Sequence, residues 1–244
     1  MKSQIKVLLL ILTLIIPCLI VFQGCSEDSI MQIQVNNSNE FITAINKVDN
    51  GGTVILNCNV ELNEEISISK KLILDLNGKT ISNSTEIWHD DNDSNLDRLG
   101  LICVRSGGDL TITGNGTIDV LENDCHAIWL DADDAKLTIK NGNINGNVSV
   151  VYVRKGLAKI EGGNYSLKQL SSSDDSRYLL NCLDENYLSD KAVILVTGGV
   201  FKNFNPGENL SEGENTNYLG ENFKVSALTT SSSVTYTVYE EIQE

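Results

Sequence analysis

The chain has few prolines, few histidines and few basic residues, and its composition excludes some classes of partner and of site. It holds two prolines and two histidines in 244 residues, and 18 Lys and Arg stand against 33 Asp and Glu. The resulting net charge of −15 argues against nucleic acid and anionic lipid as partners, because both repel an acidic surface. No Ser/His/Asp arrangement, phosphate-binding loop or basic aromatic patch stands out.

Long hydrophobic runs are also rare, and the one that is present lies at the N-terminus. Lys2 and Lys6 precede an apolar stretch over residues 7–22. That stretch is shorter than the roughly 20 residues that a membrane-spanning helix needs, and it follows basic residues as in a secretory signal. We therefore expect residues 1–24 to be a removable signal peptide.

The end of this signal carries a second pattern. Val21-Phe22-Gln23-Gly24-Cys25 resembles the lipobox of bacterial lipoproteins, in which a small residue precedes the cysteine that becomes lipidated. The resemblance implies attachment of acyl chains such as palmitate at Cys25, and more than one chain gives stable anchoring to a membrane. Residues 25–37 would then form a lipidated tether and a first strand.

The residues after Cys25 bear on location. Ser26-Glu27-Asp28 is similar to the acidic export signal of surface-displayed lipoproteins in some Gram-negative bacteria. A plain acidic tether is the alternative. The chain is thus expected in the cell envelope, lipid-anchored at the outer membrane or the cell surface.

Glycine-containing units recur along the chain and predict its architecture. Each unit has two apolar residues two apart, a corner with glycine and one more apolar residue, which is a short strand, a tight bend and the start of another strand. One unit cannot bury its own apolar face, so the units must stack. They lie at 72–81, 110–118, 137–144, 158–165 and 194–201.

A strand and a short helix are expected before these units. Met31, Ile33 and Val35 alternate with polar residues, which predicts a strand. Ser38 stands where an N-cap would, and apolar residues recur at helical spacing from Phe41. Such a helix would cover the open end of a stack.

Residues 41–201 resemble right-handed parallel β-helix proteins of the pectin-lyase-like class, most closely at 51–56 and 74–81. The resemblance implies an all-β fold: a right-handed single-stranded parallel β-helix (solenoid) of roughly six coils, with a short N-terminal capping helix. This domain would span residues 38–244. Its last part, from about residue 198, resembles a terminal unit of bacterial and phage surface β-helix proteins, which implies a C-terminal cap with a closing strand.

The same fold carries lyases, hydrolases, adhesins and inert stalks, so it does not fix an activity. The motifs that the resemblance associates with pectin-cleaving hydrolases, Asn-Thr-Asp, Asp-Asp, His-Gly and Arg-Ile-Lys, do not occur as a set. We therefore expect a non-catalytic adhesion or glycan-contact module. A small polysaccharide lyase or glycoside hydrolase is the alternative, and a structural stalk or assembly component is a second one.

Alignment of the units places a candidate glycan-binding face. Arg105, Asp131 and Arg154 fall at equivalent places, which predicts a ladder of alternating charge about 4.8 Å apart. Strand alternation turns Trp129 and Tyr152 outward on the same side, where flat rings beside charged groups suit a sugar. Alternatively, a loop covers Trp129, or the aromatics simply stack beside a surface salt ladder.

Metal and cysteine chemistry receive little support. Asp91, Asp93 and Asn95 space oxygen atoms two apart and form a candidate calcium site, but the loop lacks the sixth-position Gly and the twelfth-position Glu of the calcium-loop template. No other cofactor is expected. The cysteines outside the signal and the lipid site permit two disulfides, although the apolar alternation around the first predicts a core thiol. They are Cys58, Cys103, Cys125 and Cys182.

Overall fold

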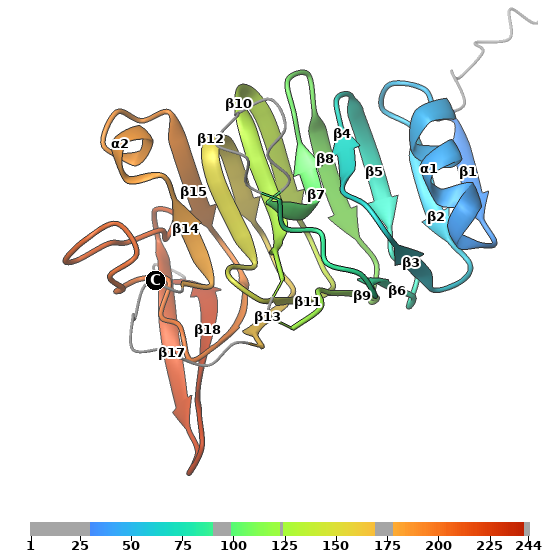
Figure 1. Cartoon of the computed structure of the whole chain (residues 1–244). Helices are drawn as coiled ribbons and strands as arrows, with labels where there is room; N and C mark the ends of the chain where they lie inside the picture. The colour runs from blue at the N-terminus through green and yellow to red at the C-terminus, as the bar shows by residue number, and fades with distance from the viewer. Residues whose placement is uncertain (1–29, 90–98, 123, 169–177, 242–244) are drawn as a thin grey trace, which may run out of the picture.

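The computed structural model describes residues 30–89, 99–122, 124–168 and 178–241. Within them the chain is mostly β, with parallel strands in two large sheets and two helices (Figure 1). The predicted signal, the lipid site Cys25 and the candidate calcium residues Asp91, Asp93 and Asn95 lie outside the described residues. No helix in the described part is long and apolar enough to cross a membrane.

Three strand positions recur in the same order along the chain, and each builds a face of parallel strands. Face 1 contains β4 (Ile66–Ile68), β7 (Gly100–Val104), the first halves of β10 (His126–Ile139) and β12 (Val151–Ile160), and β14 (Leu180–Cys182). Face 2 contains β1 (Gln32–Val35), β2 (Thr53–Leu56), β5 (Lys71–Asp75), β8 (Asp109–Thr113), the second halves of β10 and β12, and β15 (Ala192–Val196). Face 3 contains β3 (Val60–Leu62), β6 (Thr80–Asn83), β9 (Thr117–Asp119), β11 (Asn143–Gly146), β13 (Asn164–Leu167) and β16 (Gly199–Lys202).

Alternation along each strand sets the core. On face 2 every second side chain is buried, and the strand register aligns these side chains from one strand to the next. One such row joins Leu74, Ile112, Ile139, Ile160 and Val196. Each fully buried aliphatic side chain contributes about 1.5–3 kcal/mol relative to exposure, so the rows supply most of the stabilisation.

The predicted N-terminal helix is present as α1 (Ser38–Lys47), and its cap corrects the sequence prediction by one residue. The N-cap is Asn37, whose side chain accepts a hydrogen bond from the Glu40 amide. Ser38 instead accepts a hydrogen bond from the Glu61 amide of β3, at 3.0 Å. Phe41 on the buried side of the helix packs into the core, so α1 covers the first strands.

The C-terminal part departs from the parallel pattern. After face 1 ends at β14, the short helix α2 (Asp184–Tyr187) leads into β15. The predicted closing strand is β18 (Val234–Glu240), which pairs antiparallel with β16. A strand that was not predicted, β17 (Phe223–Thr229), pairs antiparallel with β18, and this hairpin projects away from the faces (Figure 1).

The four cysteines of the described chain are free thiols, so the permitted disulfides are not formed between them. Cys58 is half-buried and packs against the core, while Cys103, Cys125 and Cys182 are buried. Burial raises the pKa of each of these three buried thiols, which disfavours the reactive thiolate.

Candidate functional site

The three predicted ladder residues lie together. Arg105 Nη1 is 3.1 Å from Asp131 Oδ2, and Arg154 Nη1 is 3.3 Å from Asp131 Oδ1. One carboxylate therefore bridges two guanidinium groups from neighbouring turns of the chain. The predicted order of charges, plus, minus, plus, is confirmed.

The register that produces this ladder differs from the sequence alignment. Asp131 pairs with Lys155 rather than with Arg154, because the pairing of β10 with β12 shifts after Leu130 and leaves Arg154 as an extra residue. Such a bulge bends a strand and re-aims a side chain. The shift falls where β10 and β12 pass from face 1 to face 2, which we call the corner.

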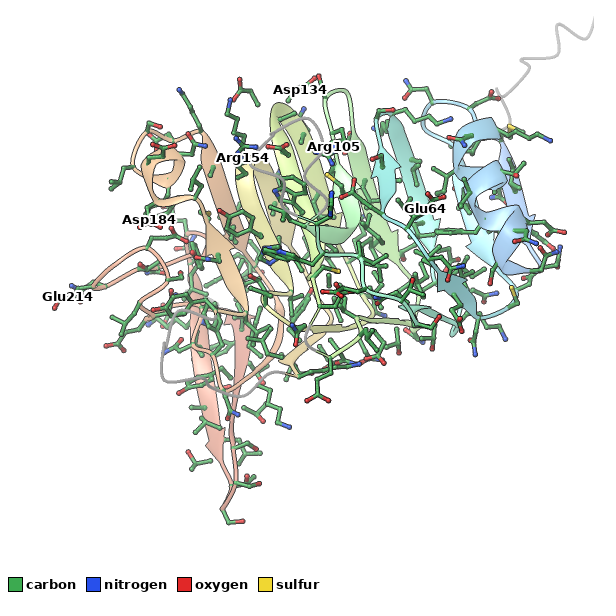
Figure 2. The ribbon with its side chains drawn as sticks, in the orientation of Figure 1. Glu64, Arg105, Asp134, Arg154, Asp184 and Glu214 are labelled. Carbon is green, nitrogen blue, oxygen red and sulfur yellow. The ribbon has the colours of Figure 1, made fainter. Side chains whose placement is uncertain are left out.

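Local structure holds the third member at the same corner. Arg105 follows β7 and opens a tight turn, which the Gly108 amide closes by donating to the Arg105 carbonyl at 2.9 Å. Figure 2 shows Arg105, Asp134 and Arg154 at the same edge of the strands. The ladder is thus built from three successive passages of the chain from face 1 to face 2.

The predicted exposure of Trp129 is wrong. Trp129 pairs with Cys103 and Tyr152 across the strands, as alternation requires, yet its exposed fraction is 0%. The Arg105 guanidinium lies over its ring, with Cζ 4.6 Å from the centroid, and reaches on to Glu65 at 2.8 Å. Alternation placed the side chain on the outer side of the sheet, where Arg105 lies over its ring. Because Trp129 is fully buried, it cannot stack on a sugar ring in this structure.

Tyr152 is also engaged within the protein. Its ring stacks on that of His126, with centroids 4.7 Å apart and planes 8° from parallel. The ring of Trp88 packs against His126, with centroids 5.7 Å apart. Burial raises the pKa of Tyr152 to about 12 and lowers the pKa of His126 to about 3. Both rings are therefore neutral near pH 7, and the group has the character of a packed aromatic stack.

A pocket opens beside the ladder at the corner. It has a volume of about 540 Å³. Its lining residues are Ser106, Asp131, Ala132, Asp133, Asp134, Arg154 and Lys155. We call it the corner pocket. It includes two of the five residues that the sequence assigned to glycan contact, and Arg105 contacts it through Asp131.

Polar groups form the walls of the corner pocket. Asp134 accepts hydrogen bonds from the Gly107 amide at 2.9 Å and from Ser106 at 3.3 Å, and the Gly107 bond lowers the pKa of its carboxyl. Lys155 Nζ lies 3.7 Å from Asp133. Both acceptors and cationic donors thus face one opening, as recognition of a polyhydroxylated ligand requires.

Asp131 is the group that the two arginines hold in place. Burial raises the pKa of its carboxyl, while Arg154 and Arg105 act in the opposite direction. Charge-assisted bonds to two guanidinium groups fix the position of both carboxylate oxygens. The base of the pocket is therefore preorganised, because its charges need not move to receive a ligand.

A second open pocket, of about 380 Å³, lies on face 2. Its charged lining residues are Lys71, Lys136, Lys140, Lys159, Asp109 and Glu161, which is four lysines against two acids. In a chain of net charge −15 this is a locally cationic surface. It would favour an anionic ligand near the corner over a neutral one.

Sequence reasoning missed three polar residues around the site. Glu65 extends the ladder by its ion pair with Arg105. The sequence feature that could have indicated it is an acidic residue directly before a face 1 strand. Asp124 is buried and accepts hydrogen bonds from the Ile87 and Trp88 amides at 2.8–3.0 Å. His126 stacks on Tyr152, and no local pattern in the sequence indicates this contact.

The described residues offer no group of three or more His, Cys, Asp or Glu that could hold a metal ion. Comparison of the chain with protein-family models, with curated proteins and with solved structures gave no match.

Proposed function

We propose that the protein is a lipid-anchored lipoprotein of the bacterial cell envelope that acts as a non-catalytic glycan-contact module. In this proposal residues 38–244 form a right-handed parallel β-helix, and the corner pocket receives the glycan. Cys25 holds the module at the membrane.

The cyclic strand order supports the β-helix. Strands of faces 1, 2 and 3 follow one another in the same order, and each pairs in parallel with the strand that occupies its position in the next turn. Six strands from β3 to β16 occupy face 3, in line with a short solenoid. In a solenoid each turn contacts only the turns before and after it, so surface residues of successive turns form rows.

The corner pocket is the observation that carries the functional proposal. Asp131 and Arg154, which the sequence placed in a glycan-binding row, line an open polar pocket of about 540 Å³. Carboxylate oxygens of Asp133 and Asp134 can accept hydrogen bonds from hydroxyl groups, and Arg154 and Lys155 can donate to hydroxyls or to a carboxylate. With Trp129 covered, polar contacts take the place of the aromatic plate that the sequence suggested.

Affinity electrophoresis tests this proposal. The chain from Ser26 onward, which contains every described residue, would be run through native gels cast with neutral and acidic polysaccharides. We expect at least one glycan to slow the protein, and Arg154→Ala to abolish the retardation. Lys168→Ala is the matched control, because its side chain is about as exposed (30% against 34%) and also pairs with one aspartate, Asp119 on face 3.

Two results would overturn the proposal. The first is that no glycan slows the protein, and the second is that Arg154→Ala and Lys168→Ala behave alike. The lyase or hydrolase alternative is examined with the same glycan, by measuring reducing ends and unsaturated products after prolonged incubation. The proposal expects none, and accumulation that Arg154→Ala removes would establish catalysis instead.

A further inference from the structure

The second sheet ends in an unpaired edge. Its strand order finishes with β17, which pairs with β18 through seven residue pairs and with no other strand of the described chain. The opposite edge of β17 therefore carries a row of backbone N–H and C=O groups that have no strand partner among the described residues. Such an edge is a template for another strand, and proteins usually protect it with charge, proline or a covering element.

The β17–β18 hairpin has little of the charge that usually prevents another strand from pairing with such an edge. From Val225 to Tyr239 the hairpin carries no charged residue, although the chain has 33 acids. Lys224 is the one charged residue of β17, and it is paired with Glu241 at 2.5 Å. The hairpin also exposes large apolar side chains, with Leu228 69% and Tyr239 45% exposed.

We propose that β17 is a dimerisation edge, and that two copies of this chain join there as antiparallel strands related by a two-fold axis. The hairpins of the two copies would then form one four-stranded sheet. The proposal goes beyond glycan contact and does not depend on it.

Charge favours a second copy as the occupant. Two copies of a chain of net charge −15 repel each other at most orientations, so self-association requires a surface without acids. The hairpin supplies one between Val225 and Tyr239. An isologous contact must also be compatible with itself. When Ser226 lies on the two-fold axis, Lys224 faces Leu228 of the other copy, so like charges do not meet and the lysine stem can cover the leucine.

The size of the edge sets the expected strength. A single seven-residue strand pair is smaller than a standard stable interface, so the dimer should form reversibly in solution. Two copies held on one membrane would meet at a higher effective concentration, and the pair would present two corner pockets to one polymer. The predicted anchor and the predicted dimer would thus reinforce each other.

Sedimentation velocity over a wide concentration range tests the dimer. We expect the chain from Ser26 onward to shift from monomer to dimer as concentration rises. Ser226→Lys should abolish the shift, because it places two ammonium groups opposite each other at the axis. Thr237→Lys is the matched control, since Thr237 pairs directly with Ser226 but lies on β18, away from the edge, and should leave the dimer intact.

A covalent trap keeps the proposal falsifiable if the lysine variant folds poorly. Antiparallel partners lie about 4.5–5.5 Å apart at Cα, within disulfide range, so Ser226→Cys in a Cys58→Ser background should cross-link on mild oxidation. The corresponding Thr237→Cys protein should not. A protein that stays monomeric throughout, with no cross-link, would overturn the proposal, as would a dimer that Ser226→Lys leaves unchanged.

Discussion

Arg105 lies across the ring of Trp129, with its guanidinium carbon 4.6 Å from the ring centroid, while its nitrogens bind Glu65 and Asp131. One side chain therefore connects the charged ladder to the covered tryptophan. Trp129 lies on the outer side of its sheet and is nevertheless fully buried. This burial shifts the surface available to a ligand from the aromatic row to the corner pocket.

Replacing Arg105 by alanine should destabilise the protein and uncover Trp129. The change removes the Arg105 cation from Glu65 and leaves Arg154 as the guanidinium that binds Asp131. We expect this to cost about 1–3 kcal/mol, because the site is partly screened by solvent. In a Trp88→Phe background, tryptophan emission should move to longer wavelength as water reaches Trp129. Lys168→Ala, which removes a more exposed pair, should leave emission unchanged, and equal emission in both variants would contradict the stacking.

His126 should make stability fall on acidification. Its pKa is lowered to about 3 in the folded protein by burial, against about 6.5 when exposed. Between these values the unfolded chain binds the extra proton, so this group's stabilisation is present above about pH 6.5 and is lost as pH falls toward about 3.

The contribution of His126 can be isolated by a variant that cannot titrate. His126→Gln should reduce the slope of unfolding free energy against pH by up to about 1.4 kcal/mol per unit in that window, whatever its effect at pH 7. Denaturation curves from pH 4 to pH 7 measure both slopes. Parallel slopes for the two proteins would show that His126 is not held neutral.

Asp124 should anchor the segment that carries Trp88. Its carboxylate accepts bonds from the Ile87 and Trp88 amides and from the Asn83 side chain at 2.6 Å. Asp124→Asn keeps the shape but replaces one acceptor oxygen by a donor, which should cost about 1–3 kcal/mol. Hydrogen exchange at the two amides should accelerate. Asp119→Asn, a change at a more exposed aspartate, should leave them protected. Unchanged exchange in Asp124→Asn would exclude this role.

Cys25 should fix the protein to the membrane. In cells, the full-length chain is expected in the membrane fraction and to incorporate labelled palmitate. Cys25→Ser should remove the label and prevent maturation of the signal, whereas Cys58→Ser should change neither. A labelled Cys25→Ser protein, or an unlabelled parent, would refute the lipid anchor.

The sequence predicted the parts of the fold that follow from alternation. Leu74, Ile112 and Ile139 stack because strand period and register both follow the apolar pattern. The cap position was missed by one residue because Asn37 and Ser38 are equally good N-caps, and only the contact of Ser38 with β3 separates them. Strand β17 was missed because its residues face little of the core.

The sequence predicted the charged ladder of the candidate site, but the exposure that it predicted for Trp129 is wrong. Equivalent positions in successive units brought Arg105, Asp131 and Arg154 together, because neighbouring turns stack. Alternation fixes the side of the sheet on which Trp129 lies, but not what covers it there, and Arg105 reaches it from another turn. The bulge at Arg154 was also invisible, since alignment assumes one residue opposite one.

Hydrogen exchange of the protein, measured with a glycan that slows it in native gels, tests whether the corner pocket binds glycan, because it locates the contact. We expect slower exchange over the corner, in the peptides that contain Asp131 to Asp134 and Arg154 to Lys155, and no change in those of face 3. Protection confined to face 3 or to the β17–β18 hairpin would contradict the corner pocket as the binding site, and uniform exchange with every glycan would contradict glycan contact itself.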